Sequence, residues 1–172
     1  MQSPPDVPPA SLFTRPAPES SIWYGSALIT FLATGEMTGG HYSMLAWRLG
    51  KGFAPPPHRH GPEDFYIIRG KMRFWVGDKE LVAVDGDHVR TVPNVWHTFQ
   101  VESDEAQFLL LFSPPGMEGF FRELGSPAAA MELPAGRVGP PDVNRLRPLA
   151  SKYGIEISPP GTTPQEISKL PK

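Results

Sequence analysis

Two of the five histidines of this chain, His58 and His60, lie one residue apart in the stretch PPPHRHGPEDFYIIRG. Residues i and i+2 of a strand point to the same face, so the two imidazoles are expected side by side. The Gly-Pro pair that follows predicts a turn, after which Glu63 opens the next strand and can bring its carboxylate to the same point. Asp64 is then expected to face the other way.

A third imidazole comes from the stretch PNVWHTF, in which His97 begins a predicted strand after a turn that contains proline. The chain has no cysteine, which excludes thiolate ligands, disulfides and a thiol nucleophile. Three imidazoles and one carboxylate suit a divalent Fe, Mn, Co, Ni, Cu or Zn ion and not Mg or Ca. We therefore predict one divalent transition-metal ion, with its identity left open, held by His58, His60, Glu63 and His97.

Two further histidines lack this pattern. His41 and His88 are each placed in a predicted strand with no acidic partner at a useful spacing. We expect both to be ordinary surface or core histidines and not ligands.

Size and charge limit the possible partners. A chain of 172 residues is long enough for one domain with a short appendage. A net charge of -2, with both signs spread along the chain, gives no basic surface for nucleic acid or an anionic membrane. No apolar run approaches the ~18 residues of a membrane span, and no leader pattern is visible at the start. We expect a soluble, unprocessed, cytoplasmic protein.

Short strands dominate the middle of the chain. From residue 22 to residue 113, runs of apolar and β-branched residues are separated by Gly, Pro or Asp, without intervening helices. This pattern predicts an all-β protein: an antiparallel sandwich, jelly roll or small barrel. The predicted strands cover residues 26–34, 41–49, 64–69, 71–77, 80–85, 88–93, 97–102 and 107–112.

The remaining segments predict short helices and extended arms. Apolar residues at positions 117, 120, 121 and 124 predict an amphipathic helix that covers the outside of the barrel or a neighbouring subunit. The patch 142–153 contains Pro148 and predicts two short turns. The proline-rich stretches 1–20 and 159 onward predict extended arms. The predicted division is an arm over 1–20, a barrel with its helix over 21–128, and a C-terminal extension over 129–172.

Two motifs resemble those of the cupin superfamily. GFAPPPHRHGPEDFYIIRG resembles the first motif and GDHVRTVPNVWHTFQ the second, which together cover 52–100. The flanks over 24–128 resemble bacterial single-domain quercetin 2,3-dioxygenase-like proteins. The resemblance implies a double-stranded β-helix, the cupin jelly roll, with one metal on the four ligands above. Two residues separate His60 from Glu63 where three or four are usual, so the carboxylate either reaches the metal from a tighter turn or fails to reach it.

The same resemblance implies an activity. It is oxidative cleavage of a flavonol or a similar aromatic molecule with O2, in which Glu63 serves as ligand and as base. Inward-facing aromatic and apolar positions are expected to wrap a small aromatic or apolar substrate. The predicted pocket residues are Met44, Trp47, Tyr66, Phe74, Trp96 and Phe99.

Two other functions remain open at this point. Cupins with this ligand set also act as cyclases, isomerases, lyases or decarboxylases, which use the metal as a Lewis acid without O2. The second alternative is a small-molecule binding cupin that is not an enzyme. Apolar faces on edge strands and on the helix over 117–124 also favour a homodimer.

Overall fold

The computed structural model describes residues 12–135 and 143–171. Its strands are short and follow one another closely along the chain, as expected for an all-β protein. Their bounds are β1 (Ser21–Tyr24), β2 (Ala27–Ala33), β3 (Ser43–Gly50), β4 (His58–Arg59), β5 (Glu63–Arg69), β6 (Met72–Val76), β7 (Lys79–Ala83), β8 (His88–Arg90), β9 (His97–Val101), β10 (Glu105–Phe112), β11 (Ser126–Pro127) and β12 (Glu156–Ile157).

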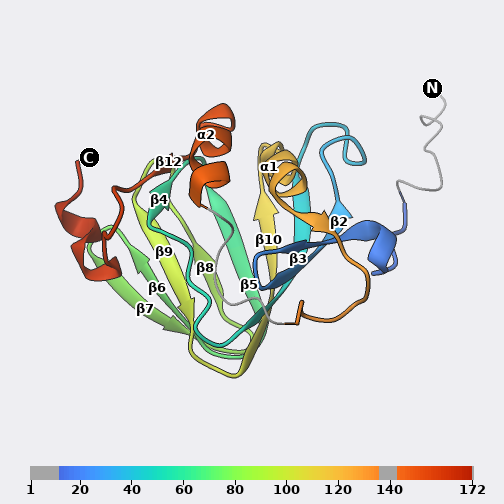
Figure 1. Ribbon diagram of the computed structural model, residues 1–172, viewed down its shortest axis with the longest axis horizontal. Coiled ribbons are helices and arrows are strands. Elements are labelled where there is room, and N and C mark those ends of the chain that lie inside the picture. The colour runs from blue at the N-terminus through green and yellow to red at the C-terminus, as the bar shows by residue number, and fades with distance from the viewer. Residues whose placement is uncertain (1–11, 136–142, 172) are drawn as a thin grey trace, which may run out of the picture.

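The strands form two antiparallel sheets that face each other (Figure 1). The seven-stranded sheet has the order β11-β1-β2-β3-β10-β5-β8, and the five-stranded sheet has the order β12-β4-β9-β6-β7. Some neighbours are consecutive strands and others come from distant parts of the chain, as β3 and β5 do on either side of β10. The predicted all-β jelly roll is confirmed.

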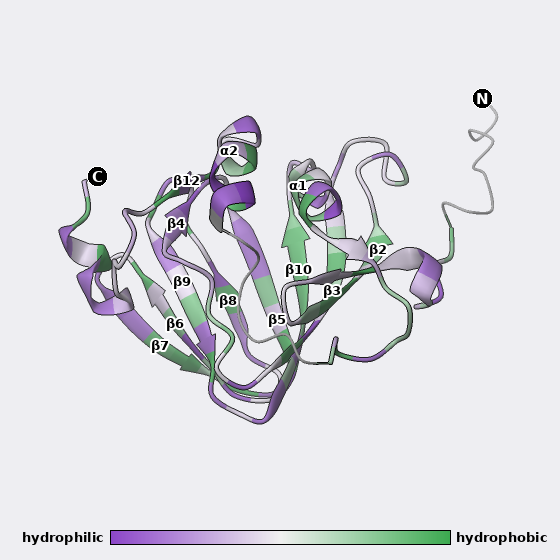
Figure 2. Cartoon of the chain, in the orientation of Figure 1, coloured by the Kyte–Doolittle hydropathy of each residue, from purple (hydrophilic) through white to green (hydrophobic). Residues whose placement is uncertain are grey.

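The apolar core fills the space between the sheets. Strand burial alternates along β3 and β10, so every second side chain points inward. Figure 2 shows β10 largely in green, as a hydrophobic strand, and α2 with much purple, as a more hydrophilic helix. Four phenylalanines from four strands, Phe65, Phe74, Phe99 and Phe108, pack edge to face or at a tilt with ring centroids 5.1–5.9 Å apart.

Two helices lie at the same end of the two sheets (Figure 1). The predicted helix over 117–124 is confirmed as α1 (Met117–Leu124). The two separate turns predicted for 142–153 are wrong: one helix, α2 (Val143–Lys152), runs through Pro148, and residue 142 lies outside the described part. Leu146 and Ala150 are buried in the core cluster, and this packing outweighs the helix hydrogen bond that proline removes.

The C-terminal tail is packed and not an extended arm, which corrects the prediction for residues 159 onward. A 3-10 turn, η3 (Pro164–Lys169), places Ile167 against Trp75 and Trp96 with 2% of its surface exposed. Arg59 and Trp96 each donate a hydrogen bond to the carbonyl oxygen of Pro171. Proline-rich composition predicts extension only when no apolar side chain in the segment has a partner surface.

The N-terminal segment is described from residue 12 onward, and 1–11 of the predicted arm lie outside the described residues. Leu12 and Phe13 are 71% and 68% exposed. A 3-10 turn, η2 (Pro18–Ser20), then leads into β1. The boundaries expected at residues 20 and 128 stay predictions.

The outer surface carries exposed apolar side chains near the edge strands β7 and β8, among them Leu81, Val82 and Val92. The apolar stripe of α1, in contrast, is buried: Phe120, Phe121 and Leu124 all pack inside. The homodimer stays a prediction, and α1 contributes no exposed apolar face to it. None of the described helices is long and apolar enough to cross a membrane.

Candidate metal centre

Three imidazoles and one carboxylate meet at the helix-covered end of the barrel. His58 on β4 and His97 on β9 are directly paired across the five-stranded sheet. His60 lies in the turn after β4, and Glu63 is the first residue of β5. One ligand atom from each of the four side chains lies within 4.8 Å of all the others. The sequence prediction placed these four residues together, and the structure brings them together.

The short turn between His60 and Glu63 still lets the carboxylate reach the cluster. Glu63 Oε1 lies 3.0 Å from His97 Nε2 and 3.7 Å from His60 Nε2. The backbone at this point is fixed by hydrogen bonds, since Glu63 N donates to Thr91 Oγ1 and Asn94 N donates to the His60 carbonyl. The tighter spacing therefore positions the carboxylate among the imidazoles.

Backbone carbonyls set the orientation of two of the imidazoles. His58 Nδ1 lies 2.8 Å from Pro56 O, and His97 Nδ1 lies 2.7 Å from Val95 O. Because a carbonyl oxygen can only accept, each Nδ1 carries the proton and each Nε2 presents a lone pair to the cluster. This outer hydrogen bond is the usual way in which a protein fixes the tautomer of a metal-ligating histidine.

Burial controls the charge of the cluster. It lowers the pKa of His58 to about 4, with a further contribution from His97, and it lowers the pKa values of His60 and His97 to about 4. All three imidazoles are therefore neutral at pH 7, the form in which histidine binds metals. Burial also raises the pKa of the Glu63 carboxyl above its usual value, and the nearby His60 and His58 offset only part of this effect.

These groups fit a divalent ion. His97 Nε2 is buried and has no hydrogen-bond partner, although Glu63 Oε1 lies 3.0 Å away. A buried polar atom of this kind is costly unless something pairs with it. Nitrogen and carboxylate donors together suit a first-row transition metal. The four side chains that would hold it are His58, His60, Glu63 and His97.

The cluster opens onto an apolar cavity of about 60 Å³. One water molecule needs ~10–15 Å³ by the same measure, so the cavity has room for only a few small atoms. Both sheets, α1, α2 and β12 contribute walls. The cavity is lined by Tyr24, Trp47, Phe53, Pro55, Pro56, His58, His60, Glu63, Phe65, Phe99, Phe108, Leu110, Met117, Phe120, Phe121, Leu146, Ile155 and Ile157.

The position of α1 corrects the expectation that its apolar stripe covers the outside of the barrel. Met117, Phe120 and Phe121 line the cavity instead. Leu146 of α2 and Ile155 before β12 complete the cover. The helix period identified the apolar face of α1, but which surface it covers depends on how the chain turns after β10.

Two of the six predicted pocket residues, Trp47 and Phe99, line the cavity. Tyr66 is turned outward and is 47% exposed, because its neighbours Phe65 and Ile67 occupy the inward positions of β5. Met44 likewise precedes an inward residue on β3 and is only half-buried.

The other two aromatic candidates are buried elsewhere. Phe74 is 1% exposed within the core between the sheets, and Trp96 packs with Trp75 and the C-terminal tail. Neither residue is part of the cavity lining. Aromatic residues in a barrel have several apolar environments available, so residue type alone does not select the cavity.

Several wall residues were missed from the sequence. Phe65 lies two residues after Glu63 on β5, and Phe108 and Leu110 alternate along β10, so strand periodicity carried a signal for these three. Leu146 and Ile155 carried none, because they come from a segment far from the barrel in sequence.

The two remaining histidines lie outside the cluster. His41 is exposed, in a bend and not in a strand. His88 Nε2 lies 2.8 Å from Asp64 Oδ1 on the surface, which corrects the expectation that it has no acidic partner. The pair forms because β5 and β8 are neighbours in the seven-stranded sheet. Asp64 faces away from the cluster, as predicted.

Comparison with known proteins agrees with this fold. Residues 46–113 match the family model for the cupin domain. The middle of this chain therefore carries a stretch that matches a cupin domain. A cupin of the RmlC-like type from Shewanella frigidimarina superimposes with a TM-score of 0.53 at 18% identity, over 63% of this chain and 95% of that one.

Two curated relatives that this chain resembles are named quercetin 2,3-dioxygenase. The protein of Bacillus subtilis (strain 168) is 28% identical over 105 residues, which make up 60% of this chain and 31% of the relative. The protein of Aspergillus japonicus is 26% identical over 117 residues, 63% of this chain and 33% of the relative. The chain thus spans about a third of the length of either relative.

Proposed function

We propose that this protein is a metal-dependent dioxygenase that cleaves a small aromatic or flavonol-like molecule with O2. The observation that carries the proposal is the cluster of three neutral imidazoles and one carboxylate at the wall of an apolar cavity. The two distant relatives named quercetin 2,3-dioxygenase support the same reaction class. Sites with open coordination positions in an apolar pocket suit substrate activation better than a structural ion.

Each group of the site has a role in this proposal. A redox-capable ion supplies a Lewis acid for a substrate hydroxyl and a partner for O2. His58, His60 and His97 hold the ion through neutral nitrogens. Glu63 is a ligand that also accepts the hydroxyl proton, since its buried carboxylate has a raised pKa and therefore a greater affinity for a proton.

The apolar walls orient the substrate and exclude water. Phe65, Phe99 and Phe108 offer ring faces and edges against which an aromatic molecule can pack. The cavity of about 60 Å³ is smaller than the roughly 300 Å³ that drug-sized ligands usually need. A flavonol therefore enters only when part of the cover formed by α1, α2 and β12 moves.

A non-redox reaction is the second candidate. The small volume of the cavity favours it, because a cyclase, isomerase, lyase or decarboxylase with a compact substrate needs less room than a flavonol. In that case the same ion acts as a Lewis acid only. Consumption of O2 separates the two candidates.

The test uses the protein reconstituted separately with Fe, Mn, Co, Ni, Cu and Zn. O2 uptake and loss of the flavonol absorbance are followed together after addition of quercetin. Coupled loss of both with at least one redox-capable ion, and neither with Zn, supports the dioxygenase. Stoichiometric metal without O2 consumption for any ion contradicts it and favours the non-redox candidate.

Replacement of Glu63 by Gln tests the carboxylate. The amide keeps the shape of the side chain but is a much weaker base, so we expect turnover to fall at least about a hundredfold. Metal content, measured by elemental analysis, is expected to remain close to that of the wild type.

Asp64→Asn is the matched control. It removes the adjacent carboxylate, which pairs with His88 on the surface, and we expect turnover to stay unchanged. Equal turnover in Glu63→Gln and the wild type would exclude Glu63 as the base.

A further inference from the structure

Trp47 on β3 has a buried indole N–H that makes no hydrogen bond. The residue is 4% exposed, and no protein atom accepts from its Nε1. Removing such a donor from water without replacing its partner is unfavourable. Buried tryptophans usually pair this group, so the unpaired N–H of Trp47 needs an explanation.

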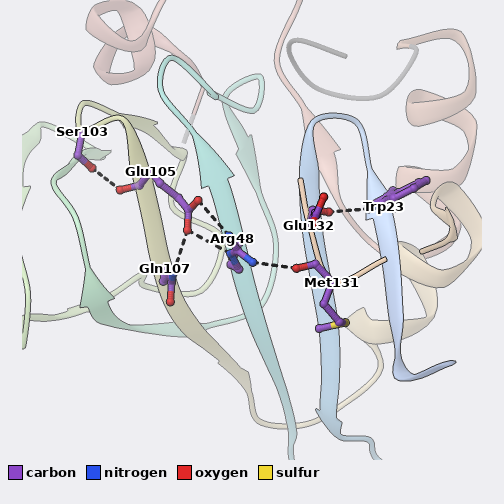
Figure 3. Close-up of polar contacts among 7 residues, drawn as sticks. All are labelled: Trp23, Arg48, Ser103, Glu105, Gln107, Met131 and Glu132. Atoms are coloured by element: carbon purple, nitrogen blue, oxygen red, sulfur yellow. Dashed lines mark hydrogen bonds and ion pairs between the residues drawn. The ribbon is translucent and has the colours of Figure 1, made fainter. Parts of the chain in front are cut away.

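The other tryptophans do not share this feature. The chain has four tryptophans, all within the described residues. Of these four described residues, Trp47 alone lines the cavity, and Trp47 is also the one with the unpaired N–H. The remaining three donate theirs, Trp23 to Glu132 O at 2.9 Å (Figure 3), Trp75 to Glu80 Oε2 at 3.2 Å and Trp96 to Pro171 O at 2.8 Å.

The indole ring of Trp47 is held rigidly by its neighbours. It stacks on Phe108 with centroids 5.7 Å apart and meets Tyr24 and Phe121 edge to face at 5.8 Å and 5.0 Å. All three neighbours also line the cavity. They offer aromatic faces, which are weaker acceptors than oxygen. The donor is therefore fixed in place and has no strong acceptor within the protein.

Trp47 also belongs to the wall that faces the histidines. Trp47 and Tyr24 come from β3 and β1 of the seven-stranded sheet, whereas His58 and His97 come from the five-stranded sheet. Apart from the metal cluster, Trp47 and Tyr24 are the only polar side chains among the described residues of the lining. Apolar side chains line the cavity between Trp47 and Tyr24 on one side and the metal cluster on the other.

We propose that Trp47 Nε1 donates a hydrogen bond to an oxygen acceptor of the substrate, of the carbonyl type. The substrate class that fits is an apolar or aromatic molecule with two oxygen functions, one directed to the metal cluster and one to Trp47. An analogue that lacks the second oxygen leaves the N–H unpaired and binds less well. The inference rests on the proposed function only in taking this cavity as the substrate site.

Two probes that differ in one acceptor test the inference. 4-Hydroxyacetophenone carries a phenol and a ketone, and 4-ethylphenol is its counterpart without the ketone oxygen. Dissociation constants for both are measured by titration calorimetry on Zn-loaded protein without O2. We expect the wild type to prefer the ketone, and Trp47→Phe to reduce that preference about tenfold, because the ring remains and the donor is lost.

Trp23→Phe is the matched control. It removes an indole N–H that is bonded to Glu132 O outside the cavity, and we expect the preference for the ketone to remain that of the wild type. Thermal unfolding of both variants checks that each is folded.

A second measurement needs no variant of Trp47. In a 15N-labelled wild-type protein, one of the indole N–H resonances is expected to move downfield with the ketone and not with 4-ethylphenol. A preference that is equal in wild type and Trp47→Phe, or no binding of the ketone at millimolar concentration together with unmoved indole resonances, overturns the inference. Neither measurement involves O2, so their outcome does not depend on whether the protein is a dioxygenase.

Discussion

Trp47 and Arg48 are neighbours on β3, but their polar groups are satisfied in opposite ways. Arg48 faces outward, where Nε and Nη2 donate to the two carboxylate oxygens of Glu105, each at 3.1 Å, and Nη1 donates to Met131 O at 3.0 Å (Figure 3). Trp47 faces the cavity, and its N–H has no partner. On the outer face of the sheet, the polar groups of Arg48 bond to other parts of the chain. On the inner face, the N–H of Trp47 has no acceptor in the protein.

The histidines repeat this difference. His88 on the surface pairs with Asp64, whereas His97 in the cluster keeps a buried Nε2 without a hydrogen bond. A polar group that serves stability is expected to have a protein partner, because an unpaired one costs free energy. The unpaired N–H at the cavity and the unpaired nitrogen in the adjoining metal cluster therefore indicate ligands, and the following substitutions test that distinction.

The largest effect on stability is expected from the apolar part of the inner face. Phe108 is 1% exposed and packs against Trp47, Phe65 and Phe99. Phe108→Ala is expected to lower the free energy of unfolding by about 3–5 kcal/mol, through lost burial and the cavity left behind. Urea denaturation measures it. Leu81→Ala, on the outer surface at 43% exposure, is the control and is expected to change stability by less than about 0.5 kcal/mol.

A large effect on metal binding and a small one on stability are expected at the cluster. His97→Ala removes one of the four ligands and is expected to weaken metal binding by more than about a hundredfold, since even outer partners of ligands contribute 10–100-fold. Metal content after dialysis against a chelator measures this. His88→Ala removes a surface histidine and is expected to leave metal content unchanged. Full occupancy in His97→Ala would separate this residue from the site.

The smallest effect is expected on the outer face. Arg48→Ala removes the paired contact with Glu105 and the hydrogen bond to Met131 O, at a side chain that is 36% exposed. We expect the free energy of unfolding to fall by about 1 kcal/mol. This loss is expected to be smaller at high salt, because salt screens the ion pair.

Lys51→Ala is the matched control for that substitution, because the side chains of its 3.8 Å pair with Asp104 are 67% and 100% exposed. We expect no measurable change in stability. A loss in Arg48→Ala as large as that in Phe108→Ala would remove the contrast between the two faces.

Periodicity predicted the parts of the fold that have strong local patterns. All the strands expected between residues 26 and 112 have counterparts, and the helix over 117–124 has the predicted bounds. The short strands β1, β11 and β12 were not predicted, because two to four residues are too few to show a period. The single helix through Pro148 was not predicted either, since its apolar face is held by the barrel and not by local propensity.

The amino-acid sequence by itself determined the chemistry of the centre. Two histidines at i and i+2, a short turn to an acid and a third histidine at the start of a later strand are local facts, and strand geometry converts them into neighbouring ligand atoms. The absence of cysteine likewise decided which donors are present.

Only the tertiary structure decided what surrounds that centre. Trp47 faces the histidines because β3 and β4 lie in different sheets, and the cover comes from α1, α2 and β12, which follow the barrel in sequence. Whether a buried N–H finds a partner depends on every chain segment that packs nearby, and no local pattern encodes those distant contacts. The metal ligands are therefore set by short stretches of sequence, whereas the shape and polarity of the cavity depend on how distant segments pack together.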